Sequence, residues 1–136
     1  MLPSIDPQAA RILIVDDQRS NIRLLEHTLK RAGYDEVMST IEPRAVAALY
    51  REHHFDLIMI DLQMPEMNGF QVMEELRGMG GAERVALLAM SADPEQMPAA
   101  LQAGGSSFLS KPFLLADVVS RVRLLLELRD PALNPH

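Results

Sequence analysis

The chain has 136 residues, of which 48% are hydrophobic and 24% are charged. This size and balance fit one globular domain with a core large enough to fold unaided. The formal net charge of −6 argues against direct binding of nucleic acid, because phosphate binding depends on clustered Lys and Arg. The absence of Cys excludes a disulfide framework, and no apolar stretch approaches the ~20 residues needed to cross a bilayer. We therefore expect a cytoplasmic protein that does not insert into membranes.

Both ends of the chain lack hydrophobic periodicity. Residues 1–10 carry two Pro among mixed polar residues, so we expect a loose N-terminal tail, and residues 130–136 are expected to form a short C-terminal tail. Between them, residues 11–129 alternate short apolar runs with helix-period segments. This alternation is typical of βα units built around a parallel sheet, and it predicts one α/β domain.

Five apolar runs predict the strands of that sheet. The first, residues 12–15, is uninterrupted and ends at two acidic residues, as is typical of a strand buried on both faces. The expected strands cover residues 12–15, 37–38, 55–60, 85–90 and 108–109.

Segments with helical periodicity separate these runs. The first helix is expected to start at Ser20, a candidate N-cap, and to stop at Gly33. Pro43 is placed to start the second, and the others cover residues 70–77, 93–103 and 115–128, with Gly78, Gly80 and Gly81 ending the first of these. Five parallel strands with helices on both faces make a doubly wound fold, in which ligands bind beyond the carboxyl ends of the strands.

Polar side chains stand at four of these strand ends. Asp16 and Asp17 follow the first strand, Asp61 ends the third, Ser91 follows the fourth and Lys111 follows the fifth. Because these ends share one edge of the sheet, we expect the five side chains to converge. Carboxylates that lie so close together repel one another and need a cation. With oxygen donors and no His or Cys at these positions, Mg²⁺ fits better than Zn²⁺.

Phosphoryl transfer gives each of these groups a distinct role, since its catalysis is mainly positioning and charge neutralisation. Asp61 can act as the nucleophile that forms an aspartyl phosphate. Asp16 and Asp17 would anchor the metal, Lys111 would neutralise phosphoryl oxygen and Ser91 would donate a hydrogen bond to it. Any one such residue is usually a cap or turn former. Their joint occurrence favours the functional interpretation.

Four stretches carry a family resemblance: ILIVDD at 12–17, DLIMIDLQMPEMNGF at 56–70, MSA at 90–92 and FLSKPF at 108–113. Together they resemble the receiver domains of bacterial response regulators, the chemotaxis-regulator-like superfamily of two-component signalling. The resemblance extends from Arg11 to about Arg129. It implies a flavodoxin-like (βα)5 sandwich with strand order 2-1-3-4-5, the order of the chemotaxis-regulator example of the doubly wound fold.

The resemblance also implies the chemistry of the site. Asp61 is expected to take a phosphoryl group from a sensor histidine kinase or a histidine phosphotransfer protein. Asp16, Asp17, Asp61 and the backbone carbonyl of Gln63 are the expected ligands of Mg²⁺. The protein is then a signalling module rather than an enzyme with a separate substrate, since it catalyses only its own phosphorylation and dephosphorylation.

Further residues match the switch of this family. Ser91 corresponds to the switch hydroxyl, Phe108 to the switch aromatic and Lys111 to the phosphate-binding lysine, and a cis bond is implied between Lys111 and Pro112. The family signals through a surface formed by its fourth helix, fifth strand and fifth helix. We therefore expect an output protein or a second copy of the chain to bind there.

Two features depart from the family pattern. Pro98 would interrupt a fourth helix that started at Pro94 with Asp93 as its cap, so this helix is expected to kink or to start late. The last helix carries apolar residues over most of its circumference, although packing on a sheet requires only one stripe. The excess is either scattered surface Leu or a binding face for a partner.

Two other functions fit parts of the pattern. Phosphatases with an aspartate nucleophile generally carry a second acid two residues later, where this chain has Gln63. A nucleotide- or flavin-binding module is the other alternative, but DDQRSN at 16–21 lacks a Gly-rich phosphate loop. Both rank below the receiver interpretation.

Overall fold

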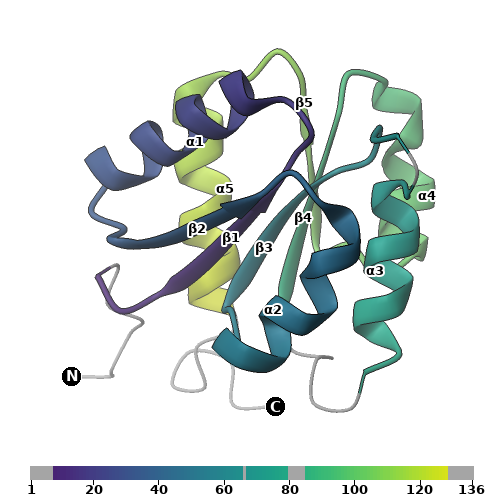
Figure 1. Cartoon of the computed structure of the whole chain (residues 1–136). Coiled ribbons are helices and arrows are strands. Elements are labelled where there is room, and N and C mark those ends of the chain that lie inside the picture. The colour runs from purple at the N-terminus through teal and green to yellow at the C-terminus, as the bar shows by residue number, and fades with distance from the viewer. Residues whose placement is uncertain (1–7, 66, 80–84, 129–136) are drawn as a thin grey trace.

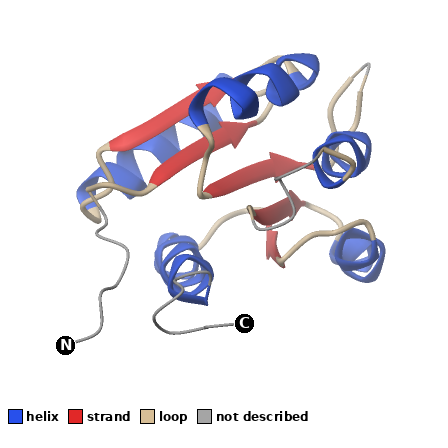
Figure 2. Ribbon diagram, turned by 90° about the horizontal axis from the view of Figure 1, so that it is seen from below, coloured by secondary structure: helices blue, strands red, loops and turns tan. Residues whose placement is uncertain are grey.

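The computed structural model describes residues 8–65, 67–79 and 85–128. Its centre is a parallel five-stranded sheet in the order β2-β1-β3-β4-β5, with helices on both sides (Figures 1 and 2). The strands are β1 (Arg11–Val15), β2 (Glu36–Thr40), β3 (Leu57–Asp61), β4 (Ala86–Ser91) and β5 (Ser107–Ser110). The predicted fold class and strand order are confirmed.

Two hydrophobic layers hold the helices on the sheet. The layer on one face joins β-strand residues to α1 and α5, and the layer on the other face joins them to α2, α3 and α4. β1, β3 and β4 are buried along most of their length because both faces are covered. The helices are α1 (Arg19–Arg31), α2 (Val46–His53), α3 (Gly69–Arg77), α4 (Met97–Gln102) and α5 (Leu115–Leu128), with 3-10 turns at Pro43–Ala45 and Pro94–Gln96.

The first helix starts earlier than predicted, and the assignment of Ser20 as its cap is wrong. Gln18 is the N-cap residue, and Ser20 lies within the first turn of α1. Asp16 explains the early start, because its carboxylate accepts the backbone N–H of Gln18 at 2.9 Å and the side-chain amide of Asn21 at 3.3 Å. Gly33, with φ of 101°, follows the end of α1 as expected.

Pro98 is accommodated by a late start of the fourth helix, as expected. The 3-10 turn comes first, and the carboxylate of Asp93 caps it by accepting the backbone N–H of Glu95 at 3.0 Å. Pro98 is then the second residue of α4, where an N–H would have no partner within the helix. The resulting α4 has only six residues.

The opposite end of α4 is attached to α3 by Arg77. Its guanidinium donates to the carbonyl of Gly104 from Nε at 3.0 Å and from Nη2 at 2.6 Å, and Nη1 donates to the carbonyl of Val85 at 3.0 Å. Gly104 has φ of 106°, and a Cβ there would lie 2.7 Å from the Arg77 side chain. The glycine therefore allows the loop after α4 to approach the guanidinium closely.

The apolar excess of the last helix lies at the surface. Val118, Val122, Leu125 and Leu126 are buried against the sheet, whereas Leu114 before the helix and Leu115, Leu124 and Leu128 within it are 46–69% exposed. Within the described ranges, no helix is long and apolar enough to cross a membrane. Gly78 ends α3 as expected, while Gly80, Gly81, residues 1–7 and residues 129–136 lie outside the described residues.

Candidate functional site

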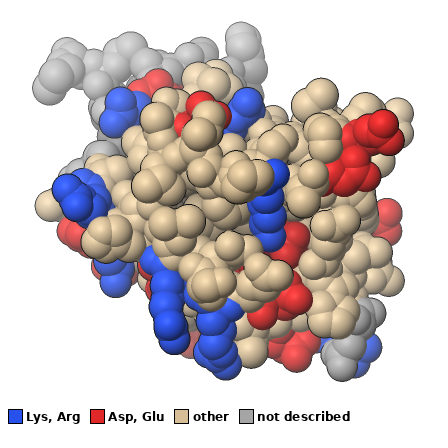
Figure 3. Space-filling model, turned by 90° about the horizontal axis from the view of Figure 1, so that it is seen from above, with Lys and Arg blue, Asp and Glu red and all other residues tan. Residues whose placement is uncertain are grey.

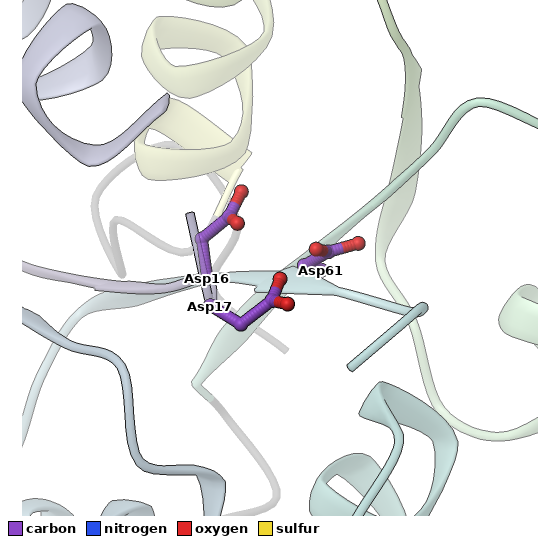
Figure 4. Close-up of side chains that lie close together, drawn as sticks. All are labelled: Asp16, Asp17 and Asp61. Atoms are coloured by element: carbon purple, nitrogen blue, oxygen red, sulfur yellow. The ribbon is translucent and has the colours of Figure 1, made fainter. Parts of the chain in front are cut away.

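Three carboxylates lie together at the carboxyl ends of β1 and β3. Val15 pairs with Ile60 in the sheet, so the residues that follow the two strands are neighbours. One ligand oxygen each from Asp16, Asp17 and Asp61 falls within 4.8 Å of the others, and Figure 4 shows the Asp17 carboxylate directed toward Asp61. Asp16 and Asp61 are buried, whereas Asp17 is exposed, so the cluster opens to solvent on one side.

Lys111 is the cation of this cluster. Its Nζ lies 3.2 Å from Oδ2 of Asp16 and 3.2 Å from Oδ2 of Asp61. The backbone N–H of Lys111 donates to the carbonyl of Ser91 at 2.8 Å, which holds the lysine beside the end of β4. The expected cis bond between Lys111 and Pro112 is present. One ammonium against three carboxylates leaves a negative balance.

The environment of Asp61 changes its acidity. Burial raises the pKa of this carboxyl from 3.8 to about 6, and the charge of Asp16 adds to the increase. The backbone N–H of Gln63, which donates to Asp61 Oδ1 at 3.1 Å, and the charge of Lys111 lower it in part. A perturbed carboxyl beside a specific charge partner is a common mark of a functional site.

Gly69 allows the chain to return close to Asp61. A Cβ at this position would lie 2.5 Å from the carbonyl oxygen of Asp61 and 2.9 Å from Cα of Leu62. The N–H of Gly69 donates to the carbonyl of Leu62 at 3.3 Å. Only a residue without a side chain lets α3 begin this close to the end of β3.

Ser91 and Phe108 lie on the same face of the sheet. Phe108 pairs with Ala89, and side chains two residues apart on a strand point to the same side. Ser91 is fully buried and Phe108 is 6% exposed. The Ser91 hydroxyl donates to Oε1 of Gln96 at 2.5 Å and accepts the backbone N–H of Asp93 at 3.0 Å.

Sequence reasoning did not single out Asn21 or Gln96, although both contact predicted site residues. Asn21 donates to Asp16 from the first turn of α1, and Gln96 accepts from Ser91 immediately before α4. Neither residue lies in the four stretches that carry the family resemblance. Their contacts depend on the exact residues at which α1 and α4 begin, and the sequence pattern predicted only a kink or a late start for α4.

The residues fit a divalent cation. Asp16, Asp17 and Asp61 each offer a carboxylate oxygen, the kind of ligand that Mg²⁺ prefers. Asp17 is exposed, so an ion could reach the cluster from solvent. Seen from above, acidic side chains gather beside a basic one near the middle of this end of the molecule (Figure 3). The arrangement can hold a cation next to the oxygens of Asp61.

Comparison with known proteins agrees with this geometry. A family model described as the response regulator receiver domain matches residues 12–123. The transcriptional regulatory protein PrrA of Mycobacterium tuberculosis is 34% identical over 119 residues, which cover 88% of this chain and 51% of PrrA. The DNA-binding response regulator MtrA of the same species is 34% identical over 93% of this chain and 54% of MtrA. This chain therefore spans about half the length of these relatives.

Solved structures share the fold over most of the chain. A putative response regulator from Chloroflexus aurantiacus matches with a TM-score of 0.82 and 26% identity, covering 86% of this chain and 97% of that one. The chemotaxis response regulator CheY4 of Vibrio cholerae matches with a TM-score of 0.80 and 29% identity, covering 86% and 98% respectively. The chain belongs to the response regulator receiver family, the signalling modules of two-component systems.

Proposed function

We propose that Asp61 accepts a phosphoryl group from a histidine kinase or a histidine phosphotransfer protein. The observation that carries this proposal is the position of Asp61. Its carboxylate is buried at the end of a rigid strand, 3.2 Å from the ammonium of Lys111 and beside two further carboxylates. A carboxylate held in this way is a positioned nucleophile.

The transfer is a single displacement at phosphorus. An oxygen of Asp61 attacks the phosphoryl group, the P–N bond of the phosphohistidine breaks and the imidazole nitrogen keeps the electron pair. The product is an acyl phosphate on Asp61. Lys111 is close enough to turn from Asp61 to a phosphoryl oxygen, where its ammonium would neutralise the charge of the transferred group. Attack of water on the same phosphorus returns the free carboxylate.

Magnesium is the expected cofactor of this step. Asp16, Asp17, Asp61 and the backbone carbonyl of Gln63 would hold the ion, which when bound supplies positive charge to the phosphoryl oxygens. The carboxylates are close enough for this role, while the part of Gln63 stays a prediction. Asp16 also holds the start of α1, because its carboxylate accepts hydrogen bonds from Gln18 and Asn21.

The signal would leave through the surface of α4, β5 and α5. This surface contains a hollow of about 390 Å³, and its lining includes Met97, Leu101, Phe108, Pro112, Leu114 and Arg121. Phe108 joins this hollow to the face of the sheet that carries Ser91. The exposed Leu side chains of α5 extend the apolar surface, so an output protein or a second copy of the chain would bind here.

Incubation with acetyl phosphate and Mg²⁺ tests the phosphoryl acceptor. Asp61 displaces acetate in this reaction, so intact-mass spectrometry is expected to show a gain of ~80 Da, the mass of a covalently added phosphoryl group. Asp61→Asn is expected to show none, and Asp35→Asn, at an exposed position after α1, is expected to behave as the wild type. An equal gain in Asp61→Asn overturns the assignment.

A turnover assay separates a receiver from a phosphatase. A phosphatase of this chemistry would release phosphate continuously from small phosphomonoesters such as p-nitrophenyl phosphate. A receiver is expected to show negligible turnover with that substrate while still gaining phosphate from acetyl phosphate.

Solution mass measured with and without the phosphoryl group distinguishes a homodimer from an output protein as the occupant of the α4–β5–α5 surface.

A further inference from the structure

We propose that Gln96 is a positioning residue that holds the Ser91 hydroxyl and competes for it with the phosphoryl group on Asp61. The inference rests on the proposed function of Asp61 and Ser91. Its basis is the hydrogen bond from Ser91 Oγ to Gln96 Oε1 at 2.5 Å. The second bond of the same oxygen, from the backbone N–H of Asp93 at 3.0 Å, also leads to the segment after β4.

A hydroxyl group has one proton and can donate only one hydrogen bond at a time. In this structure the donation goes to Gln96. A phosphoryl oxygen on Asp61 offers only acceptor atoms, so Ser91 can reach it only by withdrawing its proton from Gln96. The bond from Asp93 does not interfere, because there Ser91 is the acceptor. The competition therefore involves Gln96 alone among the two partners.

Burial requires the Ser91 hydroxyl to have a hydrogen-bond acceptor in both states, whereas Gln96 can exchange its partner for water. Ser91 is fully buried, and a buried donor without a partner is costly, so its proton must be held in either state. Gln96 is only partly buried, and water can replace the donor that its oxygen loses. A neutral hydrogen bond of this kind corresponds to roughly a three- to tenfold change in an equilibrium constant. Gln96 would thus bias the switch without locking it.

The release of Gln96 would free the N-terminus of α4. Gln96 is the N-cap residue of this helix and the last residue of the preceding 3-10 turn. The next residue, Met97, lines the hollow on the α4–β5–α5 surface and is 45% exposed. The bond to Ser91 is therefore the contact through which the hydroxyl would hold the start of this surface.

Gln96→Met tests the proposal, because it keeps a side chain of similar length and removes the acceptor. The probe is beryllofluoride with Mg²⁺, a mimic of the phosphoryl group, and its dissociation constant is followed by amide chemical shifts. We expect Gln96→Met to bind it roughly three- to tenfold more tightly than the wild type. Gln102→Met, at the exposed last residue of α4, is the matched control and is expected to bind as the wild type.

The Ser91→Ala background separates positioning from a general effect on α4. Without the hydroxyl there is no proton to compete for, so Gln96→Met is expected to leave beryllofluoride affinity unchanged in this background. Equal affinity of Gln96→Met and wild type, or the same gain in the Ser91→Ala background, overturns the inference while leaving the proposed function intact. No binding of beryllofluoride by any variant overturns both.

Discussion

The ammonium of Lys111 bridges two carboxylates, with Nζ 3.2 Å from an oxygen of Asp61 and 3.2 Å from an oxygen of Asp16. Asp61 is the predicted nucleophile, and Asp16 is a predicted ligand of the metal. Lys111 therefore occupies, in the unphosphorylated protein, the electrostatic position that a divalent cation and a phosphoryl group would share. The removal of Lys111 is expected to strengthen the binding of the cation and to slow the transfer of the phosphoryl group.

Lys111→Met is expected to bind Mg²⁺ more tightly and to accept phosphate more slowly. The tighter binding follows because the competing cation is gone. The rate with acetyl phosphate is expected to fall by about tenfold or more, since a charge-assisted hydrogen bond contributes ~1.5–3 kcal/mol. Calorimetric titration of Mg²⁺ and intact-mass time courses measure the two effects. Lys30→Met, at the exposed end of α1, is the control, and weaker Mg²⁺ binding by Lys111→Met would contradict the competition.

Magnesium is expected to stabilise the fold. At a concentration 100 times its dissociation constant, a ligand that binds only the native state raises the free energy of unfolding by about 2.7 kcal/mol. Asp17→Asn is expected to lose most of this increase, because it removes an exposed predicted ligand without disturbing the core. Urea unfolding with Mg²⁺ or with chelator measures the difference. Asp35→Asn should keep the full increase, and an unchanged response of Asp17→Asn would exclude it as a ligand.

The raised pKa of Asp61 predicts a dependence of stability on pH in the absence of metal. Burial raises this pKa from 3.8 to about 6, so the native state binds the proton more tightly than the unfolded chain. Between about pH 4 and pH 6 the contribution of this group to the free energy of unfolding therefore falls as pH rises. Above that range the buried charge costs up to about 3 kcal/mol, at 1.36 kcal/mol for each pKa unit.

Asp61→Asn removes this titration and should reveal it. In metal-free buffer at pH 8 the variant is expected to be more stable than the wild type by up to about 3 kcal/mol, with the difference shrinking toward pH 4. Urea unfolding at several pH values measures it. A variant that is less stable than the wild type at pH 8 would show that the ion pair with Lys111 outweighs the burial of the charge.

Gly69→Ala is expected to destabilise the protein by about 1–3 kcal/mol, the usual cost of forcing extra atoms into a packed site. The new Cβ would lie 2.5 Å from the carbonyl oxygen of Asp61, so β3 and α3 must separate. Phosphorylation by acetyl phosphate should slow as well, because the nucleophile moves with the strand end. Denaturant unfolding and mass spectrometry provide the two measurements.

Gly78→Ala is the matched control for this substitution. At Gly78 the nearest atom to a new Cβ is 3.5 Å away, an ordinary contact, and the backbone φ is −80°. Replacing a glycine at such a position is expected to be neutral or to stabilise by about 0.4–1 kcal/mol. Equal stability changes at the two positions would show that contact with Asp61 is not the cause.

The strands and the acidic cluster were largely predictable from the sequence. Uninterrupted apolar runs such as residues 12–15 mark strands covered on both faces, and the topology of a doubly wound sheet then brings their carboxyl ends together. The sequence placed Asp16, Asp17, Asp61 and Lys111 at one edge of the sheet because each lies within two residues of the end of a predicted strand, and the structure brings the four together. Their roles in phosphorylation and metal binding stay predictions.

The details around helix starts were not predictable in the same way. Ser20 has a common capping side chain, but the carboxylate of Asp16 holds Gln18 and Asn21, and α1 starts before Ser20, at Arg19. The contact between Gln96 and Ser91 likewise arises only after a 3-10 turn has been inserted before α4. Side-chain hydrogen bonds from Asp16 and Ser91, at the ends of β1 and β4, accompany both helix starts, and hydrophobic periodicity carries no record of such bonds.

The attachment of α4 to the rest of the molecule is unequal at its two ends. Two hydrogen bonds from Arg77 hold the carbonyl of Gly104, just beyond the C-terminus of α4, whereas Gln96 at the N-terminus of α4 is bonded to Ser91. A short helix that is held at its C-terminus and released at its N-terminus is expected to rotate about the held end instead of moving along its axis. If Ser91 releases Gln96, displacement should therefore increase from Gly104 toward Met97. Arg77, remote from the phosphorylation chemistry, would then hold the end of α4 about which the helix turns.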